Sequence, residues 1–133
     1  LMYLNFFVIP RKLGFVTSSD SGYVINNERY IPDVGFISIQ RQPKPWREAY
    51  LNKAPDLAVE VISPTDEHSK VRAKVVNYLR AGTIVWLVDP DAKQIEVYMP
   101  NAAPFTLGLT DTLNGGTLLP EFSVAVSELF PEE

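Results

Sequence analysis

Residues 55–64, with the sequence Pro-Asp-Leu-Ala-Val-Glu-Val-Ile-Ser-Pro, constrain the fold more than any other segment of the chain. The part from 57 to 62 is short, apolar and rich in β-branched side chains, which predicts a central strand covered on both faces. Glu60 stands in the middle of that strand. A buried carboxylate is destabilising by several kcal/mol unless a cation or hydrogen bonds compensate it. The fold must therefore supply both a sheet around this strand and a partner for Glu60.

The segment that follows predicts a helix, which offers such a partner. Residues 63–66 contain N-cap candidates, and the helical pattern of residues 67–81 ends at Gly82. Its apolar positions recur at helical spacing and define a buried stripe, made of Val71, Val75, Tyr78 and Leu79. Lys74 lies about 60° around the helix from Val71, at the edge of the stripe. Its long side chain can therefore start beside the core and reach outward.

A second acid, Asp33, opens another apolar run, residues 33–39, which predicts a strand. If this strand pairs in register with residues 57–62, Asp33 and Glu60 can bind one divalent cation jointly, because carboxylate oxygens hold hard cations such as Mg²⁺ or Mn²⁺. The backbone carbonyl of Val61 is a candidate third ligand, since the residue after an inward-pointing acid presents its main chain to the same ion. Such an ion could serve the hydrolysis of a phosphodiester. Lys74 would then act either as a base on the water that attacks the phosphorus, or as a positive charge that stabilises the transition state.

The rest of the chain predicts short strands and turns. Asn26 and Asn27 tolerate a positive φ and suit a hairpin turn, and residues 89–93 give a second hairpin signal. Residues 1–9 have the pattern of the end of a helix that Pro10 cannot continue, and residues 40–54 form a long polar loop. The other predicted elements are strands at 15–17, 22–25, 29–31, 83–88, 94–99 and 105–107, a turn at 114–116 and a helical turn at 127–130.

The residue types that are absent narrow the chemistry of any site. The 133 residues contain no cysteine and a single histidine, His68, which excludes a thiolate site and argues against a multi-histidine zinc site. A metal ion would have to be held by oxygen. No apolar run reaches the roughly 18 residues of a membrane span, and residues 1–9 are too short for a signal peptide. We expect a single-domain, soluble, cytoplasmic protein that does not enter a membrane.

The charge is distributed unevenly along the chain. The formal net charge is −4, but residues 101–133 hold five acids and no base, so residues 1–100 carry 12 bases against 11 acids. Binding of DNA depends on Lys and Arg close to phosphate, so two basic segments remain candidate nucleic-acid contacts. The candidates are Lys70 and Arg72 in one segment, and Arg41 and Lys44 in the other.

Each of these residues also has a purely structural interpretation. Asp33 can close an Asx-type turn, and Glu60 can lie on a half-exposed sheet face. Lys74 can belong to a solvated helix face, or it can form a buried salt bridge with Glu60 that admits no metal. Trp46 and Tyr50, in the 40–54 loop, can grip a nucleic-acid strand or simply cover a sheet edge. The sequence patterns leave these alternatives open.

Four blocks taken together resemble one bacterial family. They are Tyr-Ile-Pro-Asp-Val-Gly-Phe at 30–36, the segment 55–64, Lys-Val-Val-Asn-Tyr-Leu-Arg-Ala-Gly at 74–82, and Val-Trp-Leu-Val-Asp-Pro at 85–90. The family is the putative restriction endonuclease family, long catalogued as a domain of unknown function and abundant in cyanobacteria, and it belongs to the PD-(D/E)XK nuclease superfamily. The similarity extends over nearly the whole chain, and the order and spacing of the blocks make it more specific than any single motif.

The resemblance implies a mixed α/β (α+β) domain over residues 1–133, with the central mixed β-sheet of a restriction endonuclease-like fold flanked by helices. It implies a catalytic site of Asp33, Glu60 and Lys74. The superfamily's lysine usually lies two residues after the second acid, where this chain has Ile62, so the role passes to the helix, at Lys74 or, as a substitute, at Lys70. Family members begin some tens of residues earlier, so we expect this chain to lack an N-terminal portion that can contribute another acid.

Two functions from different classes follow. The first is a Mg²⁺- or Mn²⁺-dependent endonuclease that hydrolyses phosphodiester bonds of DNA and can act as a homodimer. The second is a nuclease-derived domain that no longer cleaves and has a binding or assembly role. Only the first predicts metal-dependent cleavage that is lost when Asp33 or Glu60 is replaced by alanine.

Overall fold

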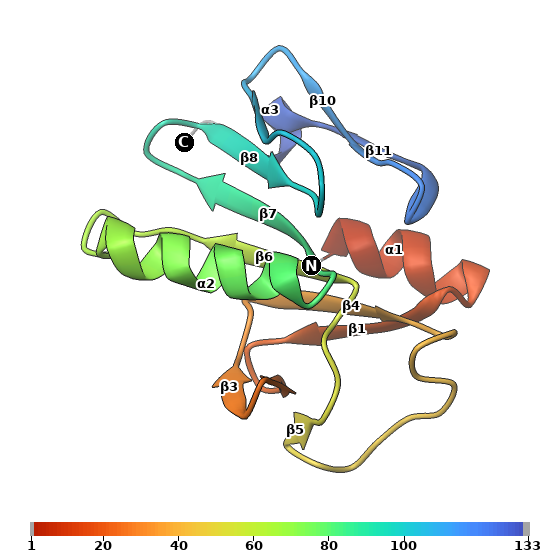
Figure 1. Ribbon diagram of the computed structural model, residues 1–133. Helices are drawn as coiled ribbons and strands as arrows, with labels where there is room; N and C mark the ends of the chain where they lie inside the picture. The colour runs from red at the N-terminus through yellow and green to blue at the C-terminus, as the bar shows by residue number, and fades with distance from the viewer. Residues whose placement is uncertain (1, 132–133) are drawn as a thin grey trace.

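The computed structural model describes residues 2–131 and is built around a six-stranded mixed sheet with the order β1-β4-β6-β7-β8-β9 (Figure 1). Its strands are β1 (Gly14–Ser18), β4 (Val34–Ser38), β6 (Leu57–Val61), β7 (Ile84–Asp89), β8 (Gln94–Tyr98) and β9 (Phe105–Leu107). Strands β6 and β7 pair in parallel, and the other neighbours in this sheet are antiparallel. The predicted central strand is confirmed, because β6 lies between β4 and β7.

Helix α2 (His68–Arg80) makes the crossover between the parallel strands and covers one face of the sheet (Figure 1). Its predicted end is confirmed: Gly82 has φ +84°, and with the next residue it donates two amide hydrogen bonds to carbonyls of the last turn, which is a Schellman motif. The predicted N-cap within residues 63–66 is wrong. The N-cap is Glu67, without a side-chain cap. Asp66 instead accepts a hydrogen bond from the Ser63 amide at 2.8 Å, so it stabilises the turn before the helix.

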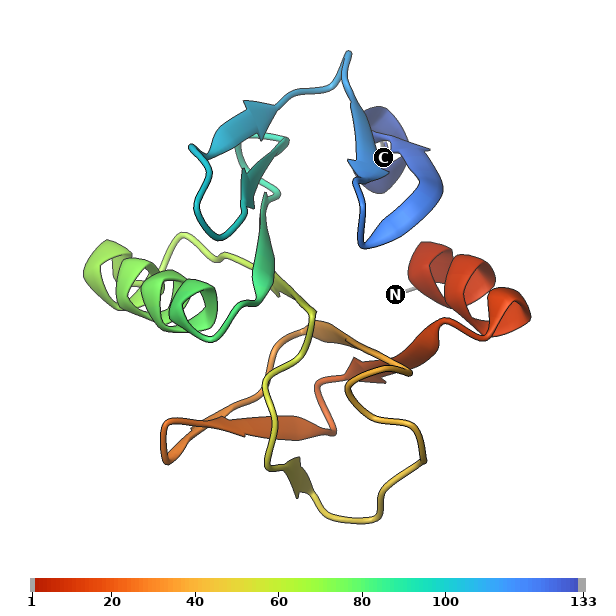
Figure 2. The same ribbon diagram turned by 45° about the vertical axis from the view of Figure 1, so that its right-hand side comes forward.

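The opposite face of the sheet packs against α1 and against a separate pair of strands, β10 and β11 (Figure 2). These elements and the short helix that follows them are α1 (Met2–Arg11), β10 (Thr112–Gly115), β11 (Leu119–Ala125) and α3 (Val126–Leu129). Side chains alternate along a strand, so β6 sends Leu57 and Val59 into this core and Ala58 and Glu60 toward α2. None of the helices within residues 2–131 is long and apolar enough to cross a membrane.

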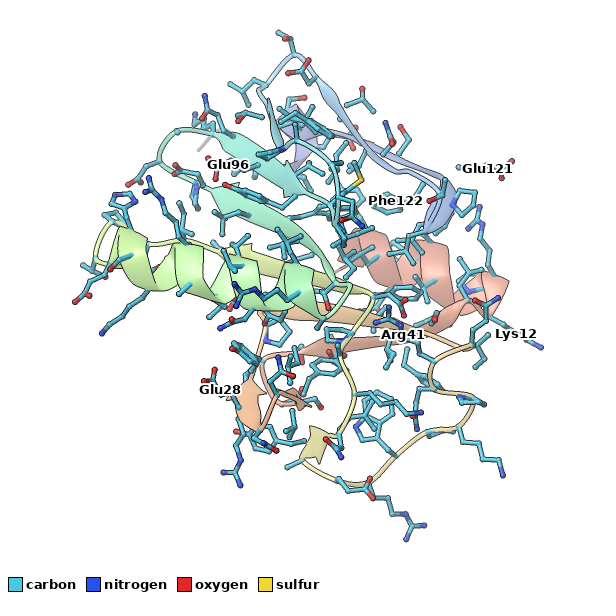
Figure 3. All side chains as sticks on the ribbon, in the orientation of Figure 1. Lys12, Glu28, Arg41, Glu96, Glu121 and Phe122 are labelled. Carbon is cyan, nitrogen blue, oxygen red and sulfur yellow. The ribbon has the colours of Figure 1, made fainter. Side chains whose placement is uncertain are left out.

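Two parts of the chain differ from the sequence-based prediction. Helix α1 continues through Pro10 to Arg11. A proline in a last turn removes a single backbone hydrogen bond, and the Arg11 guanidinium replaces some of that stabilisation by donating to the Phe7 carbonyl at 3.1 Å. The sequence patterns also miss β10 and β11. Glu121, labelled in Figure 3, has φ +71° and follows a proline, and these features break the alternation that would identify a strand.

A smaller sheet with the order β3-β2-β5 lies beneath the main one (Figure 1). It consists of β2 (Gly22–Ile25), β3 (Glu28–Tyr30) and β5 (Tyr50–Leu51), the last being a short strand within the 40–54 loop. The predicted hairpin is confirmed, since Asn26 and Asn27 have φ values of 50° and 65°. Trp46 packs edge-on against Phe15 of the edge strand β1, with ring centroids 5.5 Å apart. The loop therefore covers a sheet edge.

Candidate active site

The pairing of β4 with β6 brings the two predicted acids together. In this antiparallel pair Val34 lies opposite Val59, so Asp33, one residue before β4, stands beside Glu60. Asp33 is exposed, and its Oδ2 accepts a hydrogen bond from the Val61 amide at 2.7 Å. This bond reaches across to the neighbouring strand, so Asp33 does not form the local Asx turn considered above. It fixes one carboxylate at the end of β6.

Glu60 is buried on the α2 side of the sheet, with 9% of its surface exposed. The half-exposed alternative is therefore wrong. Its Oε2 accepts a hydrogen bond from the Tyr78 hydroxyl at 3.0 Å, and the Lys74 ammonium lies 3.6 Å from the same oxygen. Both donors come from α2, one helical turn apart on the face that packs on the sheet. The helix thus supplies the partners that a carboxylate in this strand requires.

Burial governs the ionisation of this group. It raises the pKa of Glu60 above its ordinary value, while the Lys74 charge and the Tyr78 hydroxyl oppose the rise and the Asp33 charge adds to it. Burial and the neighbouring Glu60 charge also raise the pKa of Tyr78, so the phenol stays protonated and remains a donor. Glu60 therefore exchanges its proton at a higher pH than an exposed glutamate does, and perturbed pKa values of this kind are common at functional sites.

A cleft of about 450 Å³ opens over these groups, between α2 and the ends of β4 and β6. We call it the active-site cleft, and its polar lining consists of Asp33, Glu60, Asp66, Glu67, Lys70 and Lys74, with Val61 at its wall. Lys74 is half-buried and contacts Glu60, whereas Lys70 lies at the rim and pairs with Glu67 at 3.7 Å. Lys74, rather than Lys70, is therefore the lysine placed beside the two acids.

The four predicted nucleic-acid contacts do not gather at one place. Lys70 lines the active-site cleft, and Arg72 lines a separate cavity of about 570 Å³ on the β8 side of α2. Arg41 lies beyond the other end of α2 (Figure 3), where its guanidinium bonds the Ala54 carbonyl at 3.1 Å and Asp56 at 3.2 Å. These contacts give Arg41 a structural role. Lys44 is exposed in the 40–54 loop.

The oxygen donors suit Mg²⁺ or Mn²⁺. Within residues 2–131 no group of three or more His, Cys, Asp or Glu side chains converges as a metal cage. Mg²⁺ does not need one, because it is usually held by one or two carboxylates and completes its octahedron with water and substrate phosphate. Asp33 and Glu60 supply two carboxylates, and Val61, whose carbonyl is the candidate third ligand, lines the same cleft. This donor set fits the ion that the sequence predicts.

Tyr78 is the site residue that sequence reasoning missed. Its helical spacing identifies it correctly as a buried residue, with 0% of its surface exposed. The available signal was chemical rather than periodic, since a tyrosine hydroxyl in a core has to find a hydrogen-bond partner. The nearest predicted buried acceptor along the neighbouring strand is Glu60, and that is the partner in the structure.

Comparisons with known proteins identify the family of this chain and match its fold. A family model described as "Uma2: Putative restriction endonuclease" matches residues 1–127. The crystal structure of "a putative nuclease belonging to DUF820" from Anabaena variabilis ATCC 29413 is similar, with a TM-score of 0.86 and 22% sequence identity over 97% of this chain and 74% of that chain. At this identity the similarity establishes the fold, and it confirms the predicted α+β architecture. No curated protein matches the sequence.

Proposed function

The chain belongs to the Uma2 family of putative restriction endonucleases, and from that premise we propose that it is a Mg²⁺- or Mn²⁺-dependent endonuclease that hydrolyses phosphodiester bonds of DNA. One observation carries the proposal. Asp33 and Glu60 stand side by side across two paired strands, at one cleft, with the ammonium of Lys74 3.6 Å from Glu60. Two carboxylates can hold a divalent ion for metal-assisted hydrolysis of a phosphodiester, and a neighbouring ammonium can stabilise the negative charge that develops.

Asp33 and Glu60, with the Val61 carbonyl, would hold the cation. A bound divalent ion polarises a phosphoryl oxygen and lowers the pKa of a coordinated water. The protein groups prepare that chemistry. The Val61 amide orients the Asp33 carboxylate, and the Tyr78 hydroxyl holds Oε2 of the buried Glu60.

Lys74 supplies the mobile positive charge of the site. Its side chain is 43% exposed, and its 3.6 Å separation from Glu60 is longer than a tight charged hydrogen bond. The ammonium can therefore leave Glu60 and turn toward a phosphate in the cleft, where it stabilises negative charge or orients the attacking water. Lys70, at the rim of the same cleft, is placed to neutralise a neighbouring phosphate.

A plasmid-nicking assay tests the proposal. Supercoiled DNA is incubated with the protein in Mg²⁺, in Mn²⁺ and in EDTA, beside Asp33→Ala and Glu60→Ala, with Glu48→Ala as a control at an exposed acid in the 40–54 loop. We expect nicking that needs the ion, disappears in both cleft variants and persists in Glu48→Ala. Nicking that survives Glu60→Ala, or that proceeds in EDTA, would show that the proposed site is not responsible.

A second candidate function is a nuclease-derived domain that binds without cleaving. The observation that favours it is that Lys74 and Tyr78 already compensate Glu60, so the fold does not depend on a cation. This alternative predicts a folded protein that leaves the plasmid intact in either ion. It also predicts that Asp33→Ala leaves the affinity for a DNA or protein partner unchanged.

A further inference from the structure

Two donors converge on one oxygen of Glu60 and leave the other oxygen free. The Tyr78 hydroxyl and the Lys74 ammonium both face Oε2, at 3.0 Å and 3.6 Å. Among residues 2–131, no side chain donates a hydrogen bond to Oε1. No buried side-chain nitrogen or oxygen in that part of the chain lacks a partner, so Oε1 is not enclosed in the core. Glu60 lines the active-site cleft, so the accessible Oε1 is open to that cleft.

The two donors differ in how firmly they are held. Tyr78 is fully buried, and its ring packs against Tyr30 with centroids 5.2 Å apart. Tyr30 is itself fixed, because its hydroxyl donates to Glu28 at 2.7 Å and accepts a hydrogen bond from Asn77 at 2.9 Å. Lys74, in contrast, is nearly half exposed. When the ammonium leaves Glu60, the Tyr78 bond is the contact that remains.

We propose that Tyr78 is a positioning residue for the metal site: its hydroxyl holds Oε2 of Glu60, so that Oε1 is presented to the cation while Lys74 is free to act elsewhere. This inference rests on the proposed function. It adds a role for a residue that does not itself touch substrate or ion. A hydrogen bond to a ligating carboxylate favours its ionised form and fixes its orientation, and such outer partners typically affect metal affinity by about 10- to 100-fold.

A purely structural role for Tyr78 makes a different prediction. If the ring only fills the space between α2 and the sheet, Tyr78→Phe keeps the ring and changes little at the metal site. If the hydroxyl positions Glu60, the same variant loses the donor that holds Oε2 and binds the cation more weakly. Tyr98 offers a matched control, because its hydroxyl donates to Glu96 at 3.1 Å on β8, outside the active-site cleft.

Mn²⁺ binding measured by isothermal titration calorimetry, without DNA, tests the inference. We expect Tyr78→Phe to bind Mn²⁺ about 10-fold or more weakly than the wild type, and its binding to begin at a higher pH. Tyr98→Phe should retain the wild-type affinity, and Glu60→Gln should lose binding. Wild-type affinity in Tyr78→Phe, while Glu60→Gln loses binding, would overturn the positioning role alone. No binding by the wild type would overturn both this inference and the proposed metal site.

A measurement on the wild-type protein covers the case in which Tyr78→Phe does not fold. With ¹³C-labelled tyrosine and glutamate, Mg²⁺ should shift the carboxyl carbon of Glu60 and leave the ring Cζ of Tyr78 at its hydrogen-bonded position. A Tyr78 signal that moves to the value of a free phenol when Mg²⁺ is added would mean that the cation displaces the hydroxyl. That result would refute the positioning role.

Discussion

Replacing Lys74 by methionine separates the structural and the catalytic interpretation of the Glu60–Lys74 pair. The change keeps an unbranched side chain of similar length and removes the charged ammonium with its N–H donors. At 3.6 Å the gross attraction between two unit charges is about 5 kcal/mol at an effective dielectric constant of about 20. Most of it is offset, because ionised groups lose hydration when they pair.

The net loss can be bracketed from the exposure of the two side chains. Breaking a fully buried pair is destabilising by about 3–5 kcal/mol, whereas an exposed pair contributes about 0–1 kcal/mol. Glu60 has 11% of its side chain exposed and Lys74 has 43%, and the Tyr78 bond survives the change. We therefore expect Lys74→Met to lower the free energy of unfolding by about 2 kcal/mol without metal, intermediate between these limits.

Urea unfolding in EDTA and in saturating Mg²⁺ is the assay. In EDTA the variant should unfold at a urea concentration lower by about 1 M, given a typical slope of about 2 kcal/mol per molar. In Mg²⁺ the difference should shrink to about 0.5 kcal/mol, because the cation takes over the compensation of the carboxylates. By linkage, the variant must then bind Mg²⁺ roughly tenfold more tightly than the wild type.

The control is Lys70→Met, one helical turn earlier. Lys70 and Glu67 are both largely exposed, so the expected change is below about 0.5 kcal/mol in either condition. Equal destabilisation of Lys74→Met with and without Mg²⁺ would contradict this expectation. That outcome would mean that the Glu60–Lys74 pair is structural and that no cation enters between these residues.

Three further predictions concern stability and binding. Burial raises the folded-state pKa of Glu60. The protonated carboxyl therefore stabilises the fold fully below the unfolded-state pKa of about 4.3, and this contribution is lost as the pH rises through the folded-state pKa. Glu60→Gln should unfold at higher urea than the wild type at neutral pH but not in acid, and equal pH profiles of the two proteins would contradict this. Gly82→Ala should lower stability by about 1–2 kcal/mol, because φ is +84°, and thermal melts will show whether it does. Arg41→Lys should reduce stability by about 1–2 kcal/mol through its contacts with Asp56 and the Ala54 carbonyl, yet leave DNA affinity in a gel-shift assay unchanged; weaker binding would restore Arg41 as a nucleic-acid contact.

The parts of the fold that sequence predicts well are those with strong local chemistry. Asn26 and Asn27 adopt the positive φ that their side chains tolerate, and Gly82 ends α2 because other residues are strained at its φ. The apolar run of β6 needs cover on both faces, and it receives α2 on one side and the main core on the other. Each of these features depends on a few neighbouring residues, so a short window contains the information.

The missed features depend on which groups pair with one another, and the local residue pattern does not show that pairing. The N-cap prediction fails because Asp66 is used by Ser63 in the preceding turn. Strands β10 and β11 pair with a register shift between Asn114 and Gly115, which conceals their alternation. The proximity of Asp33 to Glu60 could be predicted only conditionally, because it depends on the β4–β6 register. A slip of one residue would send Glu60 to the opposite face of the sheet.

The position of Glu60 favours a metal-binding role over a purely structural one. The apolar Leu87 lies opposite it on β7, so an apolar residue at 60 would extend the buried surface under α2 without the desolvation of a carboxylate. The chain instead carries a buried carboxylate whose pKa is raised, and it surrounds that group with two donors. A glutamine would accept the Tyr78 bond equally well. What a glutamine lacks is the negative charge and the free anionic oxygen toward the cleft, and a bound cation is the partner for which both of these are needed.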